Sequence, residues 1–358
     1  MKKDLSIIFP SFNSGDLLAR CLESVELELK DREALYEILV VDSSPICPEL
    51  PNLKNLKLIR SNVQLFASEA RNLGARIANY PILVFIDSDV ELLPGALSKL
   101  VDGLKDNNTV VAGVYEVHNP NTSPISTYQD LFLLYRYENI PPARNFFSSA
   151  QFAVSKENFQ KVGGFSENMQ SYEDVDISFK FQKNFLKAYV CLESRSYHLK
   201  SFNLKSIFLD YYYKSRNMIY YRLQKLNDLN WCDTFLPSRV RMSYYLVFFY
   251  LALFVMIVFP NGPMSMSSGI ITLSFLLAGD IGLLSDFLRF IWRETRRPIS
   301  VFKAFLFFKA TTFPIILGSL KGLYSFIRKD ESFLNKIKAT PDIVSANTTT
   351  TYTYYPKS

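Results

Sequence analysis

Two carboxylates, Asp87 and Asp89, directly follow the apolar run Pro81–Ile86 and are spaced to bind one divalent cation. The run is rich in branched and aromatic residues, which predicts a strand buried on both faces of a sheet. Open α/β sheets bind their ligands at the carboxyl ends of such strands. With only Ser88 between them, both carboxylates can approach a hard cation such as Mg²⁺ or Mn²⁺, which would neutralise a diphosphate. The alternative is a pair of solvated acids in a turn.

A second acidic group follows a pair of glycines. The segment Gly163–Glu167 begins Gly-Gly-Phe, and Glu173-Asp-Val-Asp176 comes a few polar residues later. Paired glycines permit a tight turn with positive φ, after which the acids open a helix. One carboxylate facing a cleft can act as a general base that accepts a proton from an attacking hydroxyl. The alternative is that these acids only interact with the helix dipole.

Strands and helices must alternate to position these groups. Strands are expected at Leu5–Pro10, Glu37–Val41, Leu56–Ile59 and Ile82–Ile86, and helices at Asp16–Leu29 and Ala67–Ala78. This order, with short loops, predicts an α/β fold with a mostly parallel central sheet flanked by helices. The loops at the carboxyl ends of three strands carry Asn13, Asp42 and Asp87, as a nucleotide site at that edge requires.

From about residue 107 to residue 197 the alternation is looser. Further strands are expected at Val110–Val117, Phe146–Val154 and Ala188–Cys191, around a loop with Pro141-Pro142, and a helix from about Glu173 to Phe185. We interpret residues 1–230 as one domain, with residues 1–106 as its nucleotide-binding half and residues 107–230 as its acceptor half.

The last part of the chain has the composition of membrane helices. Hydrophobic residues make up 48% of the 358 residues and aromatic residues 15%, and bilayer interfaces favour aromatic rings. Met242–Phe259 and Ser268–Leu284 are long apolar stretches joined by a turn at Asn261-Gly-Pro263, which predicts a transmembrane hairpin over residues 240–288. Arginines on both flanks predict that both ends are cytoplasmic. A third stretch, residues 299–328, either spans the membrane or lies in its interface. The alternative for the whole region is buried core helices.

Charge, cysteines and termini add weaker indications. The net charge of +6 suits an anionic nucleotide or an anionic leaflet, and the absence of a stripe of basic and aromatic residues argues against a nucleic-acid partner. The four cysteines lack metal-ligand spacing, so we expect buried free thiols and a reducing compartment. Residues 340–358 are expected to be disordered, and a cleavable signal peptide is not expected because the chain runs directly into a strand.

Four motifs in order resemble the family 2 glycosyltransferases, which have an A-type nucleotide-sugar fold. They are Ser6-Ile-Ile-Phe-Pro-Ser-Phe-Asn13, Glu37-Ile-Leu-Val-Val-Asp42, Ala70-Arg-Asn-Leu-Gly-Ala75 running to Phe85-Ile-Asp-Ser-Asp89, and Gly163-Gly-Phe through Glu173-Asp-Val-Asp176. The resemblance covers roughly residues 5–198. It implies an inverting transfer of a single sugar from a nucleotide-diphosphate donor, by a multi-pass membrane enzyme whose catalytic domain is cytoplasmic. The apolar hairpin favours a lipid-linked acceptor and a role in glycan or cell-envelope assembly.

The resemblance also implies a role for individual residues. Asp174 would be the catalytic base with Glu173 beside it. Asp89, Asp87 and His198 would bind the Mn²⁺ or Mg²⁺ ion. The donor would contact Pro10, Phe12, Asn13, Asp42, Arg71 and Asp87, and Arg216 would meet a phosphate of the donor or of a lipid. For His198 the alternative is a structural hydrogen bond, for Arg71 a surface ion pair, and for Arg216 a helix cap.

Two departures from the family pattern refine this assignment. Ser43 stands where many members have a second acid after the position of Asp42, and the Gln-x-x-Arg-Trp signature of processive synthases is absent before the first apolar stretch, which favours single-sugar transfer. One alternative function is a nucleotidyltransferase of the same fold, which a glycine-poor Ser11–Gly15 loop disfavours. Another is a membrane scaffold without catalysis, which the intact acids disfavour.

Overall fold

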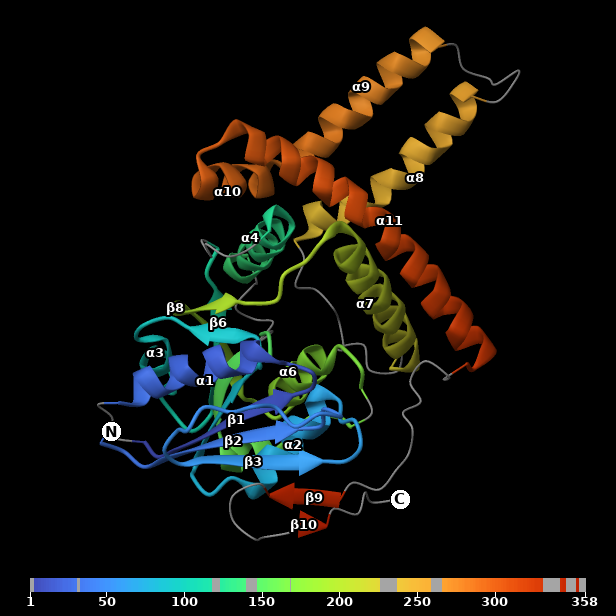
Figure 1. The fold of residues 1–358 in the computed structure, drawn as a ribbon. Coiled ribbons are helices and arrows are strands. Elements are labelled where there is room, and N and C mark those ends of the chain that lie inside the picture. The colour runs from blue at the N-terminus through green and yellow to red at the C-terminus, as the bar shows by residue number, and fades with distance from the viewer. Residues whose placement is uncertain are drawn as a thin grey trace.

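The computed structural model of the chain consists of a sheet with helices on both faces and a group of long helices beside it (Figure 1). It describes residues 3–30, 33–117, 123–139, 147–167, 169–225, 237–258, 266–330, 342–345 and 352–353. The predicted loop at Pro141-Pro142 and the turn at Asn261-Gly-Pro263 lie outside the described residues.

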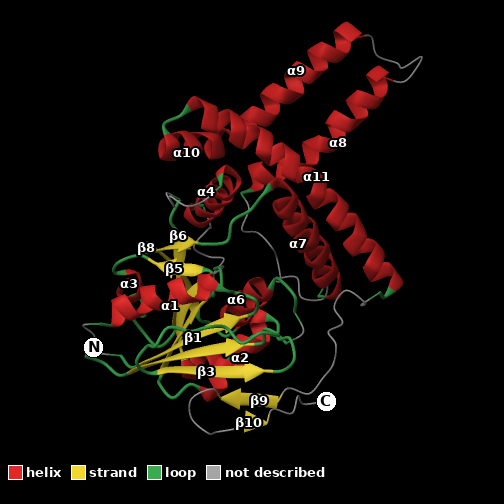
Figure 2. Ribbon diagram, in the orientation of Figure 1, coloured by secondary structure: helices red, strands yellow, loops and turns green. Residues whose placement is uncertain are grey.

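The sheet is mixed and has the strand order β10-β9-β3-β2-β1-β4-β7-β6-β8-β5 (Figure 2). Its strands are β1 (Leu5–Ser11), β2 (Tyr36–Asp42), β3 (Leu56–Ser61), β4 (Ile82–Ile86), β5 (Val90–Leu92), β6 (Thr109–Tyr115), β7 (Gln151–Ser155), β8 (Lys187–His198), β9 (Asp342–Ser345) and β10 (Tyr352–Thr353). The four strands β3, β2, β1 and β4 are parallel, as predicted. The predicted flanked α/β sheet is confirmed.

The second half of the sheet departs from the parallel pattern. Strand β7 runs antiparallel to both β4 and β6, while β6 and β8 are parallel to each other. Because β7 lies between β4 and β6 and is antiparallel to both, β6 and β8 run in the same direction as β4. Strand β8 therefore ends at the edge of the sheet where β4 ends. This arrangement depends on long-range pairing, so the alternation of local patterns could not reveal it.

Helices cover both faces of the sheet. On one face lie α1 (Asp16–Leu29) and α3 (Ala96–Asp102), and on the other lie α2 (Ala67–Ile77), α5 (Lys156–Lys161) and α6 (Glu173–Lys183). Helix α1 packs through Leu18, Leu22 and Val25, which recur at helical spacing and are fully buried. The apolar strands β1, β2 and β4 therefore have both faces covered, and only their carboxyl ends remain available to a ligand.

The remaining helices form a separate layer. They are α4 (Pro124–Glu138), α7 (Leu204–Gln224), α8 (Ser238–Val258), α9 (Met266–Leu283), α10 (Ser285–Thr295) and α11 (Pro298–Arg328). Figure 1 shows α8 and α9 projecting side by side away from the sheet, as the predicted hairpin requires. Helices α8 and α11 are long and apolar enough to cross a membrane, and α9 with α10 would be a third span if this pair, bent by 62°, is counted as one.

A polar cluster ties the hairpin to α11. Lys309 on α11 pairs with the fully buried Asp280 of α9, and its Nζ donates to Ser243 Oγ of α8 at 2.7 Å. Tyr250 also donates to Asp280 Oδ2 at 3.1 Å. Because an ion pair between apolar helices is costly to separate, it fixes which faces of the three helices meet.

Helices α7 and α11 pack at close range through two glycines. A Cβ atom added at Gly318 would lie 2.1 Å from the carbonyl oxygen of Tyr212, and one added at Gly322 would lie 2.3 Å from that of Arg216. Small residues four apart let two helix backbones approach closely. Figure 1 shows the resulting parallel course of α7 and α11 down one side of the molecule.

Within this layer, aromatic rings connect α4 to α10 and α11, and Val114 of β6 belongs to the same apolar cluster. Tyr135 of α4 packs on Phe287 of α10 with ring centroids 5.1 Å apart, and Phe132 packs on Phe287 at 5.5 Å and on Phe308 of α11 at 6.0 Å. Phe287 and Phe308 are fully buried. We call this cluster, with Tyr128 included, the aromatic junction.

Two weaker predictions need revision. Strands β9 and β10 lie in the tail that we expected to be disordered, and β9 pairs antiparallel with β3; the other residues of 340–358 lie outside the described residues. Among the described cysteines, Cys21 is buried, but Cys47 is exposed, so burial does not protect all the thiols.

Candidate active site

A cavity of about 770 Å³ opens at the carboxyl edge of the sheet. Its wall contains five of the predicted site residues: Asp87, Asp89, Glu173, Asp174 and His198. They come from the end of β4, the start of α6 and the end of β8. The fold thus brings together the two acidic motifs, which are far apart in the sequence.

Arg71 forms an ion pair with each of the two acidic motifs. Its guanidinium is 1% exposed and pairs with Asp87 Oδ1 through Nη2 and with Glu173 Oε1 through Nη1, the latter at 3.2 Å. Burial raises the pKa of Asp87 to about 6, because desolvation and the charge of Asp89 outweigh the attraction of Arg71. Arg71 is a buried group that pairs with both acids and does not line the cavity; its predicted contact with the donor stays a prediction.

His198 lies between two carboxylates. Its Nε2 is 3.6 Å from Asp89 Oδ2, and its Nδ1 is 3.6 Å from Asp130 Oδ1. Burial disfavours the imidazolium, but Asp130 and Asp89 outweigh this effect and raise the pKa of His198 to about 9. The ring also stacks on Tyr115, with centroids 4.7 Å apart. Asp130, a residue that the sequence reading missed, thus faces the ring nitrogen of His198 that points away from Asp89 and is placed to orient the ring.

Asp174 has the environment of a general base. Burial, and then the charge of Glu173, raise the pKa of Asp174 to about 7. Its Oδ1 accepts one hydrogen bond, from the backbone N–H of Val175 at 2.8 Å. Glu173 is instead held by Arg71. The two adjacent acids thus have different roles, and Asp174 is the one suited to accept a proton near neutral pH.

The start of α6 is fixed by the loop before it. Gly163 and Gly164 have φ of 78° and 64°, and a Cβ atom at Gly164 would lie 2.7 Å from Asn72 Oδ1. Asn72 on α2 makes two hydrogen bonds to the loop. Its Oδ1 accepts from the backbone N–H of Phe165 at 3.0 Å, and its Nδ2 donates to the carbonyl oxygen of Phe165 at 2.9 Å. The Arg-Asn pair of the third motif therefore positions the fourth.

The residues present fit a cation that arrives with phosphate oxygens. Among the described residues, no group of three or more His, Cys, Asp or Glu side chains gathers to hold a metal ion. Asp89 and His198 do converge, and Mg²⁺-type ions are commonly bound by one or two carboxylates together with the phosphates of a substrate. This site accordingly suits a metal bound jointly by protein and diphosphate.

The loop after β1 lies beside the acidic triplet. Ser14 Oγ and Ser88 Oγ are 2.6 Å apart, so the loop that carries Phe12 and Asn13 contacts the segment between the two aspartates. Phe12 and Asn13 are exposed, and Asn13 has a φ of 53°. Pro10, Phe12 and Asn13 lie at the correct edge of the sheet, outside the wall of the 770 Å³ cavity.

Asp42 connects the loops at this edge of the sheet through hydrogen bonds and an ion pair. Its side chain is fully buried and accepts from Ser11 Oγ at 2.8 Å and from Ser44 Oγ at 2.6 Å, and it pairs with Arg60. With its oxygens engaged in this way, Asp42 holds the β1 and β2 loops together. The predicted contact between Asp42 and the donor stays a prediction.

Arg216 is also a structural group. It is 8% exposed, its Nε donates to Asn217 Oδ1 at 3.0 Å, and its guanidinium lies 5.1 Å from the centre of the Tyr213 ring. It does not line the cavity. The prediction that Arg216 meets a phosphate is therefore not supported, and its neighbour Lys214 faces the cavity instead.

The sequence reading missed the basic and aromatic part of the cavity. The cations in its wall are Arg136, Lys200, Lys214, Arg222 and Arg241. They come from three helices and one loop, so no motif groups them. A signal was present at Arg136, a single charge in the apolar run Leu131–Tyr137.

We expect Arg71→Met to destabilise the protein by about 3 kcal/mol, because it leaves carboxylates near each other without the buried cation. The matched control is Arg76→Met on the same helix, where the pair with Glu167 is exposed (45% and 41%) and should contribute less than about 1 kcal/mol. Denaturant unfolding of both variants in detergent measures the difference. Equal losses would show that Arg71 has no special role in the site.

Residues 6–163 match the model of the family described as Glycosyl transferase family 2. The match begins within β1 and ends at the first glycine of the fourth motif. It confirms the resemblance predicted from the four motifs.

Curated relatives match between about a third and a half of the chain. An uncharacterized glycosyltransferase of Haemophilus influenzae is 27% identical over 49% of this chain and 61% of its own length. Polypeptide N-acetylgalactosaminyltransferase 4 of Mus musculus is 26% identical over 49% of this chain and 36% of its own. Poly(ribitol-phosphate) beta-N-acetylglucosaminyltransferase TarP of Staphylococcus aureus is 29% identical over 34% and 39%. The chain thus spans less than two thirds of each of these relatives.

One solved structure matches nearly the whole fold. The mannosyltransferase PcManGT of Pyrobaculum calidifontis, in complex with GDP-Man and Mn²⁺, aligns with a TM-score of 0.59 at 15% identity, over 91% of this chain and 88% of its own. At this identity the likeness confirms the A-type fold. The alignment reaches beyond the sheet domain into the helical layer.

Proposed function

We propose, from the premise that residues 6–163 form a glycosyl transferase family 2 domain, that this chain is a membrane enzyme that transfers one sugar with inversion. Its donor is a nucleotide-diphosphate sugar and its acceptor is lipid-linked. One observation carries the proposal: the catalytic acids and the apolar side chains of two candidate membrane helices line the same cavity.

The donor side of the site uses the carboxyl edge of the parallel strands. The nucleoside lies along the exposed loop with Phe12 and Asn13, which Asp42 and Ser44 hold in place. The diphosphate then reaches Asp87 and Asp89. PcManGT, which has the same fold, is solved with GDP-Man and Mn²⁺, and this supports a nucleotide-sugar donor.

Asp89 would hold the divalent cation together with the diphosphate, and Asp87 would add negative charge beside it. His198 would join as a ligand by releasing the proton that Asp89 and Asp130 favour. When bound, Mn²⁺ or Mg²⁺ acts as a Lewis acid that stabilises the leaving nucleoside diphosphate. Asp130 keeps His198 turned toward Asp89. Arg71 keeps Asp87 and Glu173 at a fixed separation.

Asp174 takes the proton of the acceptor hydroxyl as its oxygen attacks the anomeric carbon. The bond between that carbon and the diphosphate oxygen breaks on the opposite face, and the electron pair leaves with the nucleoside diphosphate. Single displacement of this kind inverts the anomeric centre. A pKa of about 7 makes Asp174 basic enough to accept the proton while about half of the carboxyl groups are ionised at neutral pH.

The acceptor enters from the helical side. Besides the acids, the cavity wall contains cations, including Lys214 and Arg222 of α7 and Arg241 of α8, and apolar side chains such as Phe248 and Ile316. These three kinds of group suit the sugar, the phosphate and the hydrocarbon of a lipid-linked acceptor. A soluble acceptor would leave the apolar end without a use.

The membrane orientation follows from the arginines that flank the hairpin. Arg239 and Arg241 precede it, and Arg289 and Arg293 follow it. By the positive-inside rule both ends, and with them the catalytic domain, face the cytoplasm.

A transfer assay with the full-length protein tests the proposal. The protein in neutral detergent is first screened by thermal shift against nucleotide sugars with Mn²⁺. The stabilising donor, labelled in its sugar, is then incubated with a lipid extract of the source membrane. We expect label to move into the organic phase together with release of the nucleoside diphosphate.

Other products would point to other functions. Release of pyrophosphate from a nucleoside triphosphate and a sugar phosphate would identify a nucleotidyltransferase. Label retained only in the aqueous phase would exclude a lipid-linked acceptor. Failure of every nucleotide sugar to stabilise the protein would indicate a scaffold without catalysis.

A further inference from the structure

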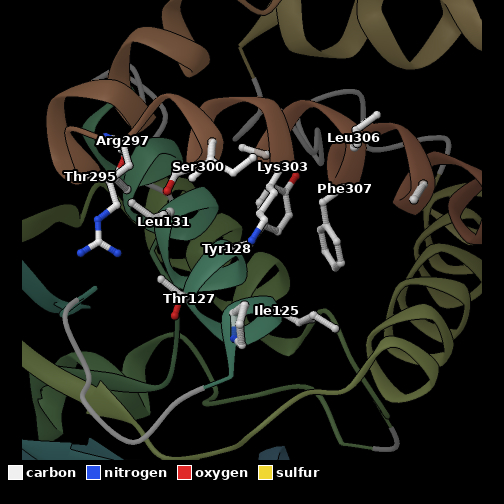
Figure 3. A pocket seen from close by; sticks show the side chains of 14 residues that line it. Ile125, Thr127, Tyr128, Leu131, Thr295, Arg297, Ser300, Lys303, Leu306 and Phe307 are labelled. Atoms are coloured by element: carbon white, nitrogen blue, oxygen red, sulfur yellow. Dashed lines mark hydrogen bonds between the residues drawn. The ribbon is translucent and has the colours of Figure 1, made fainter.

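A second cavity, of about 680 Å³, lies between α4 and the start of α11. Figure 3 shows the α4 side chains Ile125, Tyr128 and Leu131 facing Ser300 and Phe307 of α11 across it. It shares no lining residue with the catalytic cavity. The family motifs contribute nothing to it.

The wall of this cavity combines hydrocarbon with positive charge. Most of its lining is apolar, including Leu131, Leu306 and Phe307, and its two charged residues are Arg297 and Lys303. Both cations are exposed residues, and neither has an ion-pair partner among the described residues. Among the residues that the structure describes, no acidic side chain lines the cavity. Two cations without an ion-pair partner among the described residues, next to an apolar cavity, favour a ligand that has both an anionic group and a hydrocarbon chain.

The position of the cavity along α11 agrees with this chemistry. Helix α11 is long and apolar enough to cross a membrane, and Arg297 and Lys303 stand at its first two turns. Lys and Arg at the end of such a helix lie at the level of the lipid headgroups, and basic pockets between membrane helices on the cytoplasmic side bind anionic headgroups.

We propose that this cavity binds one anionic phospholipid, with its phosphate between Arg297 and Lys303 and an acyl chain against Leu131 and Phe307. Free phosphate would leave the apolar wall unused, and a zwitterionic lipid would bring its own cation to the two basic side chains. The proposal depends on the membrane placement proposed above but is independent of sugar transfer.

The bound lipid also has a structural consequence. Tyr128 and Leu131 on one side of α4 line the lipid cavity, while Gln129, Phe132 and Arg136 line the catalytic one. A lipid held between α4 and α11 therefore supports one wall of the active site from outside. Anionic lipid should for this reason stabilise the folded protein by mass action.

Lipid binding is measured on the full chain in neutral detergent, by native mass spectrometry and by thermal unfolding, during titration with phosphatidylglycerol or phosphatidylcholine. Phosphatidylglycerol should bind at one site and raise Tm, whereas phosphatidylcholine should not. The double variant Arg297→Gln/Lys303→Gln should bind phosphatidylglycerol about thirtyfold more weakly, from the contribution of each cation near an anionic headgroup.

Two further variants keep the test decisive. Arg296→Gln removes the same charge one residue away from the cavity lining and should change affinity less than about twofold. Ser300→Phe keeps every charge but fills the cavity, so it should also abolish binding of phosphatidylglycerol. This variant replaces the double variant in the test if the double variant does not fold. The proposal would be overturned if the two lipids bound equally well, or if Arg296→Gln lost as much affinity as the double variant. It would also be overturned if Ser300→Phe bound phosphatidylglycerol fully, or if inorganic phosphate raised Tm as much as phosphatidylglycerol does.

Discussion

Replacing Asp174 by Asn should lower kcat for sugar transfer by about 10² to 10⁴-fold, the usual contribution of a general base. The amide cannot accept the proton of the attacking hydroxyl, whereas the donor contacts at Asp87 and Asp89 remain. Steady-state kinetics and a donor-binding titration on the same preparation measure both effects. Normal turnover of the variant would show that Asp174 is not the base.

The pH profile gives a second measure of the same role. Because burial and Glu173 raise the pKa of Asp174 to about 7, the base is protonated below that pH and ionised above it. In the unmodified enzyme, kcat/KM should therefore fall about tenfold per pH unit below pH 7 and level off above it. Glu173→Gln removes the charge that helps to raise this pKa, so its profile should shift to lower pH. If Glu173→Gln did not shift the pH profile, the charge of Glu173 would have no influence on the base.

Removing the metal should have an effect of similar size. Lewis-acid stabilisation of a leaving diphosphate contributes several kcal/mol, so excess EDTA or Asp89→Asn should lower kcat/KM about 10³-fold. A readout without turnover is the thermal shift that Mn²⁺ produces in the presence of a nucleoside diphosphate. Asp89→Asn should abolish this shift.

The control for that experiment is the exposed Asp102→Asn on α3, which should keep both activity and the Mn²⁺-dependent shift. Because Asp89 and His198 bind the cation only with the diphosphate in this scheme, Mn²⁺ alone should give a small shift in every variant. Full activity in excess EDTA would remove the metal from the mechanism.

The sequence predicted what depends on local patterns. The buried runs β1, β2 and β4 are mostly apolar, and each is followed by a polar turn, so their positions and the edge that carries Asp87 and Asp89 could be predicted. The fourth motif was also recognisable, because Gly163 and Gly164 adopt the positive φ that paired glycines favour. These features are encoded within a few residues.

Contacts between distant segments could not be predicted in this way. Asp42 and Arg216 have the residue types of ligand-binding groups, but Ser11, Ser44 and Arg60 satisfy the first, and Asn217 and Tyr213 contact the second. Asp130 lies in a helix that no motif marks, and only the return of β8 brings His198 to it. The antiparallel insertion of β7 was missed for the same reason, since pairing between remote strands decides it.

The apolar helices were located by composition, but their relation to the site was not. Length and apolarity predicted the hairpin, and α8 and α9 occupy its two arms. The hydropathy pattern contains no information that α7 packs against α11 through Gly318 and Gly322, or that α8 and α11 wall the catalytic cavity. That relation follows from packing, and it makes residues of these helices part of the cavity wall.

The aromatic junction joins α4 to α10 and α11, with Phe287 and Phe308 fully buried against Tyr135 and Phe132. Because Val114 of β6 belongs to the same apolar cluster, the junction links the sheet to the helices that the proposed function places in the membrane. In that proposal Asp174 lies at one height above the lipid, so the enzyme acts only on a hydroxyl at that height. After transfer, the newly added sugar would stand farther out, so the same lipid should not be extended a second time.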